Sequence, residues 1–367
     1  MLNGWDWYHV PGTTASHYPI EERADKKVKA SRKKQRITQR NIHRNYSSKR
    51  YVGGVTLGKN GFFVHDLEAL PFTSPTDLAA RKTYFFTGDK VLALGTDISG
   101  GTRQDETHTT LFQTSLNSAE QITTLNGRSI DGLQTKITIP AGSAASITDA
   151  AGNSYYLADS SADLIITRQQ QQSLTTNYKP TEGLFKQAYL NHGIKPKSDF
   201  YAYVLIPDDP DGSKLKQLSD KPTEFYQVIK GDEDMHLVTF PQESLTAYAF
   251  YEDSAETPEN FAIQEVHIPA AVLQQQKGRN LHIAASVPDI GWKFDYQKIA
   301  RDGSNAAKTY FNSQPAKVHE LELTLRGKWK LAKPDNGISL KHRGGKTYVE
   351  LNVTNGLPGN FLLAPVS

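Results

Sequence analysis

The sequence predicts an all-β protein: a large antiparallel β-supersandwich followed by a smaller C-terminal β-sandwich. The chain has 17 Tyr, 15 Phe and 4 Trp among its 367 residues, and aromatic residues favour strands. Its apolar runs are short and are separated by turn residues at intervals of about 8–12 residues, as in sandwiches and barrels. Few stretches carry the start and stop signals of helices.

The clearest strand pair lies at residues 84–95. An aromatic run is followed by Gly88-Asp89 and then by an apolar run, which is the pattern of a tight hairpin. Further strands are expected, in chain order, at 109–113, 137–139, 154–157, 164–167, 200–206, 225–229, 236–240 and 245–250.

Helical signals are confined to two places. Residues 31–39 predict a short basic helix, and residues 180–189 predict a single helical turn.

A change of composition at 252–260 predicts a domain boundary. This stretch is acidic, contains a proline and is poor in apolar residues. The predicted domains are therefore 1–255 and 256–367. Strands of the second domain are expected at 262–268, 281–285, 318–325 and 347–353, with a closing strand near Phe361.

Composition narrows the class of protein. Hydrophobic residues make up 37% of the chain and charged residues 22%, a balance that allows a packed core. The sequence has no run of about 18 apolar residues, so no transmembrane helix is expected. No leader with a basic start and an apolar middle is recognised on this chain. The absence of Cys excludes disulfides, thiolate metal sites and cysteine nucleophiles.

The net charge of +3 is unevenly distributed. Residues 21–50 hold 12 Lys/Arg and 3 Asp/Glu, a net charge of +9, so the rest of the chain carries −6. A basic stretch of this kind favours a polyanionic partner such as nucleic acid or acidic polysaccharide. A solvated loop without a partner is the alternative interpretation.

No complete catalytic or metal-binding pattern occurs in the sequence. The 11 His are scattered, so His9, His17 and His43 are expected to be surface or packing residues, and no metal site is predicted. Phosphate-loop, dinucleotide and nucleophile-elbow patterns do not occur. Gly53-Gly54 and Gly100-Gly101 are interpreted as turn or bulge glycines. Residues 208–212 resemble part of a calcium loop but lack its closing Glu, so a plain turn is expected.

Residues 5–14, Trp-Asp-Trp-Tyr-His-Val-Pro-Gly-Thr-Thr, form the most informative stretch. Aromatic side chains followed by Pro-Gly are typical of a recognition surface, although burial of Trp5 and Trp7 in the core is the open alternative. Such a segment usually lies inside a domain. Its position near residue 1 suggests that the chain begins within a larger architecture.

This stretch resembles the W-D-W-N-R-M-P-G-T-T segment of chondroitin ABC lyases, in polysaccharide lyase family 8. Further segments similar to that family follow in the same order, and together they cover essentially the whole chain. They lie at residues 109–113, 180–185 with His192, 226–228, 235–237, 248–251, 287–289, 327–329 and 356–358.

The resemblance implies a fold and an activity. In that family a helical toroid precedes a central β-supersandwich and a smaller C-terminal β-sandwich, and this chain resembles the last two. The family cleaves uronic-acid glycosaminoglycans (chondroitin sulfate, dermatan sulfate or hyaluronan) by β-elimination. The parent enzyme would be secreted or periplasmic. No cofactor is implied, and the use of a divalent cation such as calcium is left open.

The chain departs from the family pattern at the catalytic groups. The family's His, Tyr and Arg belong to the helical domain, which has no counterpart in this chain. Residues 53–61, Gly-Gly-Val-Thr-Leu-Gly-Lys-Asn-Gly, lack the Glu that the family carries in this loop. The nearest carboxylates, Asp66 and Glu68, are not assigned its role. No catalytic residue is therefore predicted, and the chain is expected to be inactive unless a helical domain is supplied elsewhere.

The remaining hypotheses concern binding. Aromatic faces stack on sugar rings, and basic groups meet carboxylates and sulfates. Under the lyase interpretation the partner is an acidic polysaccharide, with neither nucleic acid nor a membrane. A non-catalytic glycan-binding β-sandwich protein is the alternative, and a nucleic-acid binder is less favoured because the basic stretch lacks interleaved aromatics. The candidate substrate-binding residues are Trp5, Trp7, Tyr8, His9, Arg44, Asn45, Lys49, Arg50, Lys59 and Asn60.

Overall fold

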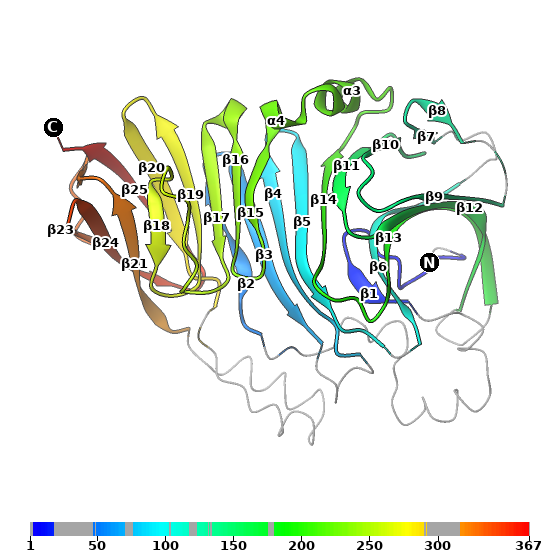
Figure 1. Ribbon diagram of the computed structural model, residues 1–367, viewed down its shortest axis with the longest axis horizontal. Coiled ribbons are helices and arrows are strands. Elements are labelled where there is room, and N and C mark those ends of the chain that lie inside the picture. Colours follow the sequence, from blue (N-terminus) through cyan, green and yellow to red (C-terminus); the bar gives the residue numbers. More distant parts are fainter. Residues whose placement is uncertain are drawn as a thin grey trace, which may run out of the picture. The chain divides into compact units, whose positions relative to one another are not determined.

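The computed structural model is built from antiparallel strands (Figure 1). This confirms the predicted all-β sandwich class. Among the described residues, no helix has the length and apolar character needed to cross a membrane. The predicted helix at 31–39 lies outside the described residues. The structure describes residues 3–17, 47, 49–69, 76–102, 104–116, 123–130, 132, 134–174, 180–289, 291 and 316–366.

The chain divides into two compact units that interleave along the sequence. The first unit contains residues 1–47, 68–80 and 97–220, and the second contains residues 48–67, 81–96 and 221–367. The units are defined by spatial contacts, and each contains several separate segments of the chain. They therefore do not test the domain boundary predicted at 255/256, which stays a prediction.

The first unit holds two layers of strands. Phe112 and Tyr155 join the layers, with ring centroids 5.0 Å apart. One layer is a five-stranded sheet in the order β1 (Thr14–Ser16), β6 (Glu106–Ser115), β13 (Pro180–Ile194), β12 (Asp163–Leu174) and β9 (Thr135–Ile139). The other contains, in spatial order, β14 (Asp199–Ile206), β11 (Ser154–Ser160), β10 (Ala145–Thr148), β7 (Thr124–Leu125) and β8 (Arg128–Ser129).

The helical turn predicted at 180–189 is wrong, because these residues belong to the long strand β13. β13 pairs with β12 on one side and with β6 on the other. Two hydrogen-bonded ladders outweigh the weak local preference for a turn, and Gly183 disfavours a helix interior.

A helix that the sequence analysis did not predict follows β14. Helix α3 (Ser213–Asp220) buries Leu215 and Leu218. The Asp209 carboxylate accepts hydrogen bonds from the backbone N–H groups of Lys214 and Leu215, at 3.0 Å each. The plain turn expected at 208–212 is present, closed by a hydrogen bond from the Gly212 N–H to the Asp209 carbonyl oxygen at 3.1 Å.

Two of the tight hairpins of the second unit lie within residues 52–99. The hairpin predicted at 84–95 is confirmed as β4 (Ala79–Thr87) and β5 (Lys90–Ser99), most of whose residues belong to this unit. The strands β2 (Val52–Leu57) and β3 (Asn60–Glu68) form the other hairpin. Both loops have two residues and begin with a glycine at positive φ, which is 62° for Gly58 and 59° for Gly88. A glycine adopts this conformation at the least cost.

Gly53 and Gly54 lie inside β2, paired in regular register with Val64 and Phe63, so their interpretation as turn or bulge glycines is wrong. A Cβ at Gly54 would lie 2.4 Å from the Phe62 carbonyl oxygen, so this position needs a residue without a side chain. Gly100 and Gly101 follow β5 with φ values of 81° and 112°, as expected for turn glycines.

A β-sandwich makes up the rest of the second unit. Its larger sheet has the order β15 (Gln227–Gly231), β16 (Met235–Phe240), β17 (Leu245–Phe250), β19 (Ala270–Lys277), β20 (Asn280–Ser286), β25 (Gly359–Pro365) and β22 (Trp329–Leu331). Its smaller sheet has the order β18 (Ile263–Val266), β21 (Val318–Arg326), β24 (Lys346–Thr354) and β23 (Ile338–Arg343).

Two short helical turns interrupt this sheet region. Helix α4 (Pro222–Phe225) precedes β15, and the 3₁₀ turn η2 (Pro241–Glu243) joins β16 to β17. The strand predicted at 225–229 therefore begins two residues late, at Gln227. Pro222 opens α4 because its fixed φ suits the first helical turn.

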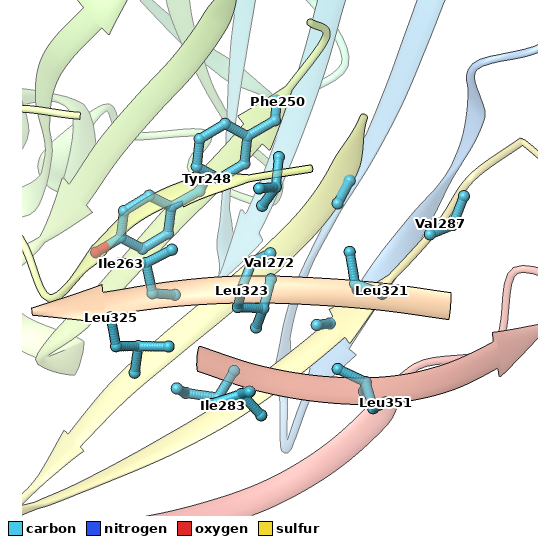
Figure 2. Packing of buried hydrophobic residues seen from close by; sticks show 14 of the residues in the cluster. Tyr248, Phe250, Ile263, Val272, Ile283, Val287, Leu321, Leu323, Leu325 and Leu351 are labelled. Atoms are coloured by element: carbon cyan, nitrogen blue, oxygen red, sulfur yellow. The ribbon is translucent and has the colours of Figure 1, made fainter. Parts of the chain in front are cut away.

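The sandwich core forms where alternate residues of both sheets face each other (Figure 2). On β21, Leu321, Leu323 and Leu325 belong to the same buried cluster as Tyr248 and Phe250 of β17. The period of two in their spacing is what a half-buried strand requires. Each buried leucine contributes about 1.5–3 kcal/mol relative to an exposed one.

Candidate functional site

The N-terminal segment, residues 3–17, is fixed to the first unit by the side chain of Gln113 on β6. Gln113 Oε1 accepts a hydrogen bond from the Asp6 backbone N–H at 2.9 Å. Its Nε2 donates to the carbonyl oxygens of Asp6 and His9, at 2.9 and 3.0 Å. One buried amide therefore holds the turn that carries the aromatic side chains.

A glycine contact holds the start of the segment. Gly4 has a φ of 77°, and a Cβ there would lie 2.4 Å from the Gly183 backbone nitrogen on β13. The Gly4 N–H also donates to Thr181 Oγ1 at 3.2 Å. A side chain at position 4 would therefore push the segment away from β13.

Trp5 and Trp7 are half-buried. They therefore lie between the two alternatives that the sequence left open, which were an exposed stacking surface and burial in the core. Their rings meet edge to face with centroids 6.4 Å apart, and Trp5 meets Phe185 of β13 in the same way at 6.1 Å. Both indoles are thus anchored and keep part of their surface exposed. Tyr8 is buried and meets the His17 ring at 6.1 Å.

The structure brings three histidines together around this segment, and we call His9, His17 and His108 the histidine cluster. One ring nitrogen from each lies within 4.8 Å of the other two. His9 Nε2 and His108 Nδ1 are hydrogen-bonded at 2.9 Å. The rings are stacked, with centroids 4.4 to 5.1 Å apart.

Carboxylates border the cluster on two sides. Asp6 Oδ2 accepts a hydrogen bond from His17 Nε2 at 2.7 Å and lies 3.6 Å from His9 Nδ1. Glu106 Oε2 lies 3.2 Å from His108 Nε2. The His9 Nδ1 atom is buried and has no hydrogen-bond partner among the described residues.

Burial keeps two of these rings uncharged at neutral pH. Loss of solvent lowers the pKa of His9 well below its ordinary value, and it lowers the pKa of His108 to about 3, with the charge of His17 adding to the effect. The Tyr189 phenol stacks on both rings at 4.5 and 4.4 Å. Burial raises the pKa of Tyr189 to about 12.

Sequence reasoning missed the histidine cluster because strand pairing creates it. His108 lies opposite Ala15 in the β1–β6 ladder, 93 positions away in the chain. The His17 N–H donates to the Glu106 carbonyl oxygen at 2.8 Å, while the His9 N–H closes a turn on the Asp6 carbonyl oxygen at 3.1 Å. The available signal was the resemblance itself, in which His9 stands where the family has Arg.

The basic candidate residues that the structure describes lie in the second unit, and each is paired with a carboxylate. Lys49 pairs with Asp66 at 3.4 Å, Arg50 with Asp289 at 3.3 Å, and Lys59 with Glu243 at 3.3 Å. The other candidates are Asn60, which is buried at the start of β3, and Arg44 and Asn45, which lie outside the described residues.

Asp66 belongs to a polar network on β3 and β4. Its Oδ1 lies 3.6 Å from Arg81 Nε, and Arg81 also pairs with Glu252 at 2.8 Å. Burial raises the Asp66 pKa above its ordinary value, although Arg81 and Lys49 oppose the shift. These contacts fit the structural role expected for Asp66.

A second buried histidine, His236 on β16, has both ring nitrogens hydrogen-bonded, and we call it with Thr83 of β4 and Thr96 of β5 the His236 network. His236 Nδ1 bonds Thr83 Oγ1 at 2.7 Å, and Nε2 bonds Thr96 Oγ1 at 2.8 Å. The Thr96 hydroxyl donates to the Asp232 carbonyl oxygen, so it must accept from Nε2. His236 is therefore neutral, with its proton on Nε2.

A family model described as "Polysaccharide lyase family 8, super-sandwich domain" matches residues 1–219. The chain is 27% identical over 349 residues to a chondroitin sulfate ABC exolyase from Proteus vulgaris, covering 92% of this chain and 33% of that protein. It is 25% identical over 370 residues to a chondroitin sulfate ABC endolyase from Proteus vulgaris, covering 99% and 33%. The chain therefore spans about a third of the length of these curated relatives.

Solved structures show the same fold. A xanthan lyase from Paenibacillus superposes with a TM-score of 0.73 at 18% identity, covering 98% of this chain and 31% of that one. A chondroitin AC lyase from Streptomyces coelicolor A3, solved in complex with chondroitin sulphate, gives a TM-score of 0.67 at 17% identity, covering 99% and 41%.

Proposed function

Since the chain belongs to polysaccharide lyase family 8, we propose that it is the β-domain part of a lyase that cleaves uronic-acid glycosaminoglycans by β-elimination. Chondroitin sulfate, dermatan sulfate and hyaluronan are the substrates considered. The family match over residues 1–219 carries this proposal. The relatives that are named for chondroitin sulfate support the choice of substrate class.

The reaction requires three kinds of group. The C5 proton of the uronate is weakly acidic while the neighbouring carboxylate keeps its charge, so polar groups must stabilise the enolate-like transition state. A base removes the C5 proton, and an acid protonates the leaving O4. The bond that breaks is C4–O4, and a double bond forms between C4 and C5.

We infer that this chain contributes binding and not proton transfer. The half-buried indoles of Trp5 and Trp7 are anchored and retain exposed surface, which suits stacking on a sugar ring. The imidazoles of His9 and His108 are buried, so a base at either position would not reach the C5 atom of a polymer.

The β2–β3 hairpin adds to this inference. Gly58 is the first residue of its two-residue loop, with a φ of 62°, and no Glu is present between Leu57 and Lys59. General acid–base groups contribute about 10²–10⁴-fold and an electrostatic stabiliser about 10²–10³-fold. Without them, no measurable turnover is expected from the chain alone.

The direct test follows the ultraviolet absorbance of the unsaturated uronate. The purified chain is incubated with chondroitin sulfate, dermatan sulfate or hyaluronan, first alone and then with the helical domain of a relative. We expect no rise with the chain alone and a rise in the mixture. A rise with the chain alone would show that it carries its own proton-transfer groups.

Binding is measured separately on the same polysaccharides. The double substitution Trp5→Ala and Trp7→Ala should weaken binding about tenfold, since one aromatic contact contributes about 0.5–1.5 kcal/mol. Phe86→Ala is the matched control, because Phe86 is an exposed aromatic of β4. Equal losses in the two variants would exclude the N-terminal segment as a binding surface.

A non-catalytic glycan-binding protein is the second candidate. The absence of the Glu that the family loop carries between the positions of Leu57 and Gly58 favours it. Binding of chondroitin sulfate with no rise in absorbance in the mixture would support this candidate over the lyase proposal.

A further inference from the structure

The histidine cluster is the group of ionisable side chains that the proposed function leaves unused. His9 and His17 stand on either side of β1 in the N-terminal segment, and His108 lies on β6. His9 and His108 are buried, and the His17 side chain is 23% exposed. Of the three rings, only that of His17 is thus partly accessible to solvent.

We propose that His9, His17 and His108 bind one transition-metal ion of the zinc type. One nitrogen from each ring already lies within 4.8 Å of the other two. Zinc–imidazole bonds are about 2.0–2.1 Å long, so the ligand atoms of a tetrahedral site lie about 3.3 Å apart. Binding would require the rings to close to this spacing by turning about their side-chain torsions.

The chemistry of the surrounding atoms selects the ion. Imidazole nitrogen suits zinc, copper, nickel and cobalt, whereas calcium and magnesium prefer oxygen ligands. Three imidazoles leave a fourth position, which Asp6 is placed to fill, because its Oδ2 lies 2.7 Å from His17 Nε2 and 3.6 Å from His9 Nδ1.

An unsatisfied atom is the second observation. His9 Nδ1 is buried and has no hydrogen-bond partner among the described residues. A buried polar atom without a partner costs about 1–3 kcal/mol. A metal ion bound on this side of His9 would remove that cost.

The binding test uses the full chain after treatment with a chelator. Zn²⁺, Co²⁺ and Ni²⁺ are titrated separately by calorimetry, and Co²⁺ is also followed by its visible absorption. We expect one ion per chain for Zn²⁺ and a Co²⁺ spectrum of a site with nitrogen ligands. Ca²⁺ should not bind at this site. The absence of saturable binding near one equivalent for all three metals would overturn the proposal.

Variants locate the site. His17→Gln should weaken Zn²⁺ binding by at least tenfold, and it changes the one ring of the cluster that is partly exposed. Asp6→Asn should weaken binding by a smaller factor. His342→Gln is the control, because His342 is exposed on β23 in the second unit.

Thermal unfolding tests whether the buried His108 is also a metal ligand. Zn²⁺ should raise the melting temperature of the wild-type chain and of His342→Gln, but not that of His17→Gln. His108→Gln, if it folds, should lose the zinc-dependent shift as well. Unchanged zinc affinity in both His17→Gln and His108→Gln would refute the assignment. This result would leave the lyase proposal untouched, since the two rest on different residues.

Discussion

His236 in the second unit and His9 in the first are both buried histidines, yet their surroundings differ. Both nitrogens of His236 bond threonine hydroxyls, at 2.7 and 2.8 Å. His9 bonds one histidine through Nε2, while its Nδ1 has no hydrogen-bond partner among the described residues. The difference teaches that a buried histidine with both nitrogens hydrogen-bonded belongs to the scaffold. A buried histidine with an unpaired nitrogen beside other imidazoles is a candidate metal ligand.

The largest effect expected from this comparison is on stability. His236→Ala should lower the free energy of unfolding by about 3 kcal/mol, because it opens a cavity and removes two buried hydrogen bonds. His17→Ala should cost about 1–1.5 kcal/mol, because it removes one hydrogen bond, to Asp6, from a partly exposed side chain. Urea denaturation measures both. Equal losses in the two variants would break the comparison.

Acidification should lower the free energy of unfolding, because His236 is neutral in the folded protein. Burial lowers the pKa of His236 to about 3, while the unfolded chain keeps a value near 6.5. Above pH 6.5 the group is neutral in both states and contributes no pH dependence. Below this pH the unfolded chain binds the proton first, so stability should fall by about 2 kcal/mol between pH 6.5 and pH 5.

His236→Gln provides the control for the acid experiment. An amide can donate and accept in the same site but does not titrate, so the variant should lose less stability over this pH range. Asp232 and Arg81 face His236 with opposite effects on its charge, and both remain in the variant. The same slope for both proteins would show that His236 is not the titrating group.

A smaller effect is expected where Gln113 holds the N-terminal segment. Gln113→Ala removes hydrogen bonds to the backbone of Asp6 and His9 and should cost about 1–2 kcal/mol. The loss should be local, with faster hydrogen exchange at the Asp6 amide. Gln275→Ala, which removes one bond to the Glu243 carbonyl oxygen, should leave that amide unchanged.

The smallest effect concerns the surface charges. Lys59→Ala breaks the ion pair with Glu243 and should change the free energy of unfolding by less than about 0.5 kcal/mol, because exposed pairs contribute little. If Lys59→Ala lowered the free energy of unfolding as much as His236→Ala, exposed ion pairs and buried hydrogen-bond networks would contribute equally to stability, contrary to this comparison. Thermal unfolding at low and high salt is the measurement.

Much of the fold could be predicted from the sequence, because alternation and turn residues are local signals. The hairpin at Gly88-Asp89 and the core face of β21 follow from them directly. The failures at 180–189 and at Gly53-Gly54 have a common cause. In both places pairing with a neighbouring strand decides the conformation, and the local sequence of a strand does not predict which strands pair with it.

The candidate site was less accessible to prediction. The aromatic segment was recognisable from its composition, but the histidine cluster joins residues 9, 17 and 108 through the pairing of β1 with β6. No spacing rule for metal ligands covers such a separation. The unpaired nitrogen of His9 became visible only when every hydrogen bond of the segment could be followed.

The short strand β1 has a consequence for solubility. It covers three residues of β6, and beside it Gly12 and Thr13 exchange backbone hydrogen bonds with Thr110. Strands left open at the margin of a sheet recruit other chains and aggregate. The N-terminal segment therefore acts as a cover for β6, and chains lacking it should form intermolecular β-structure through this strand.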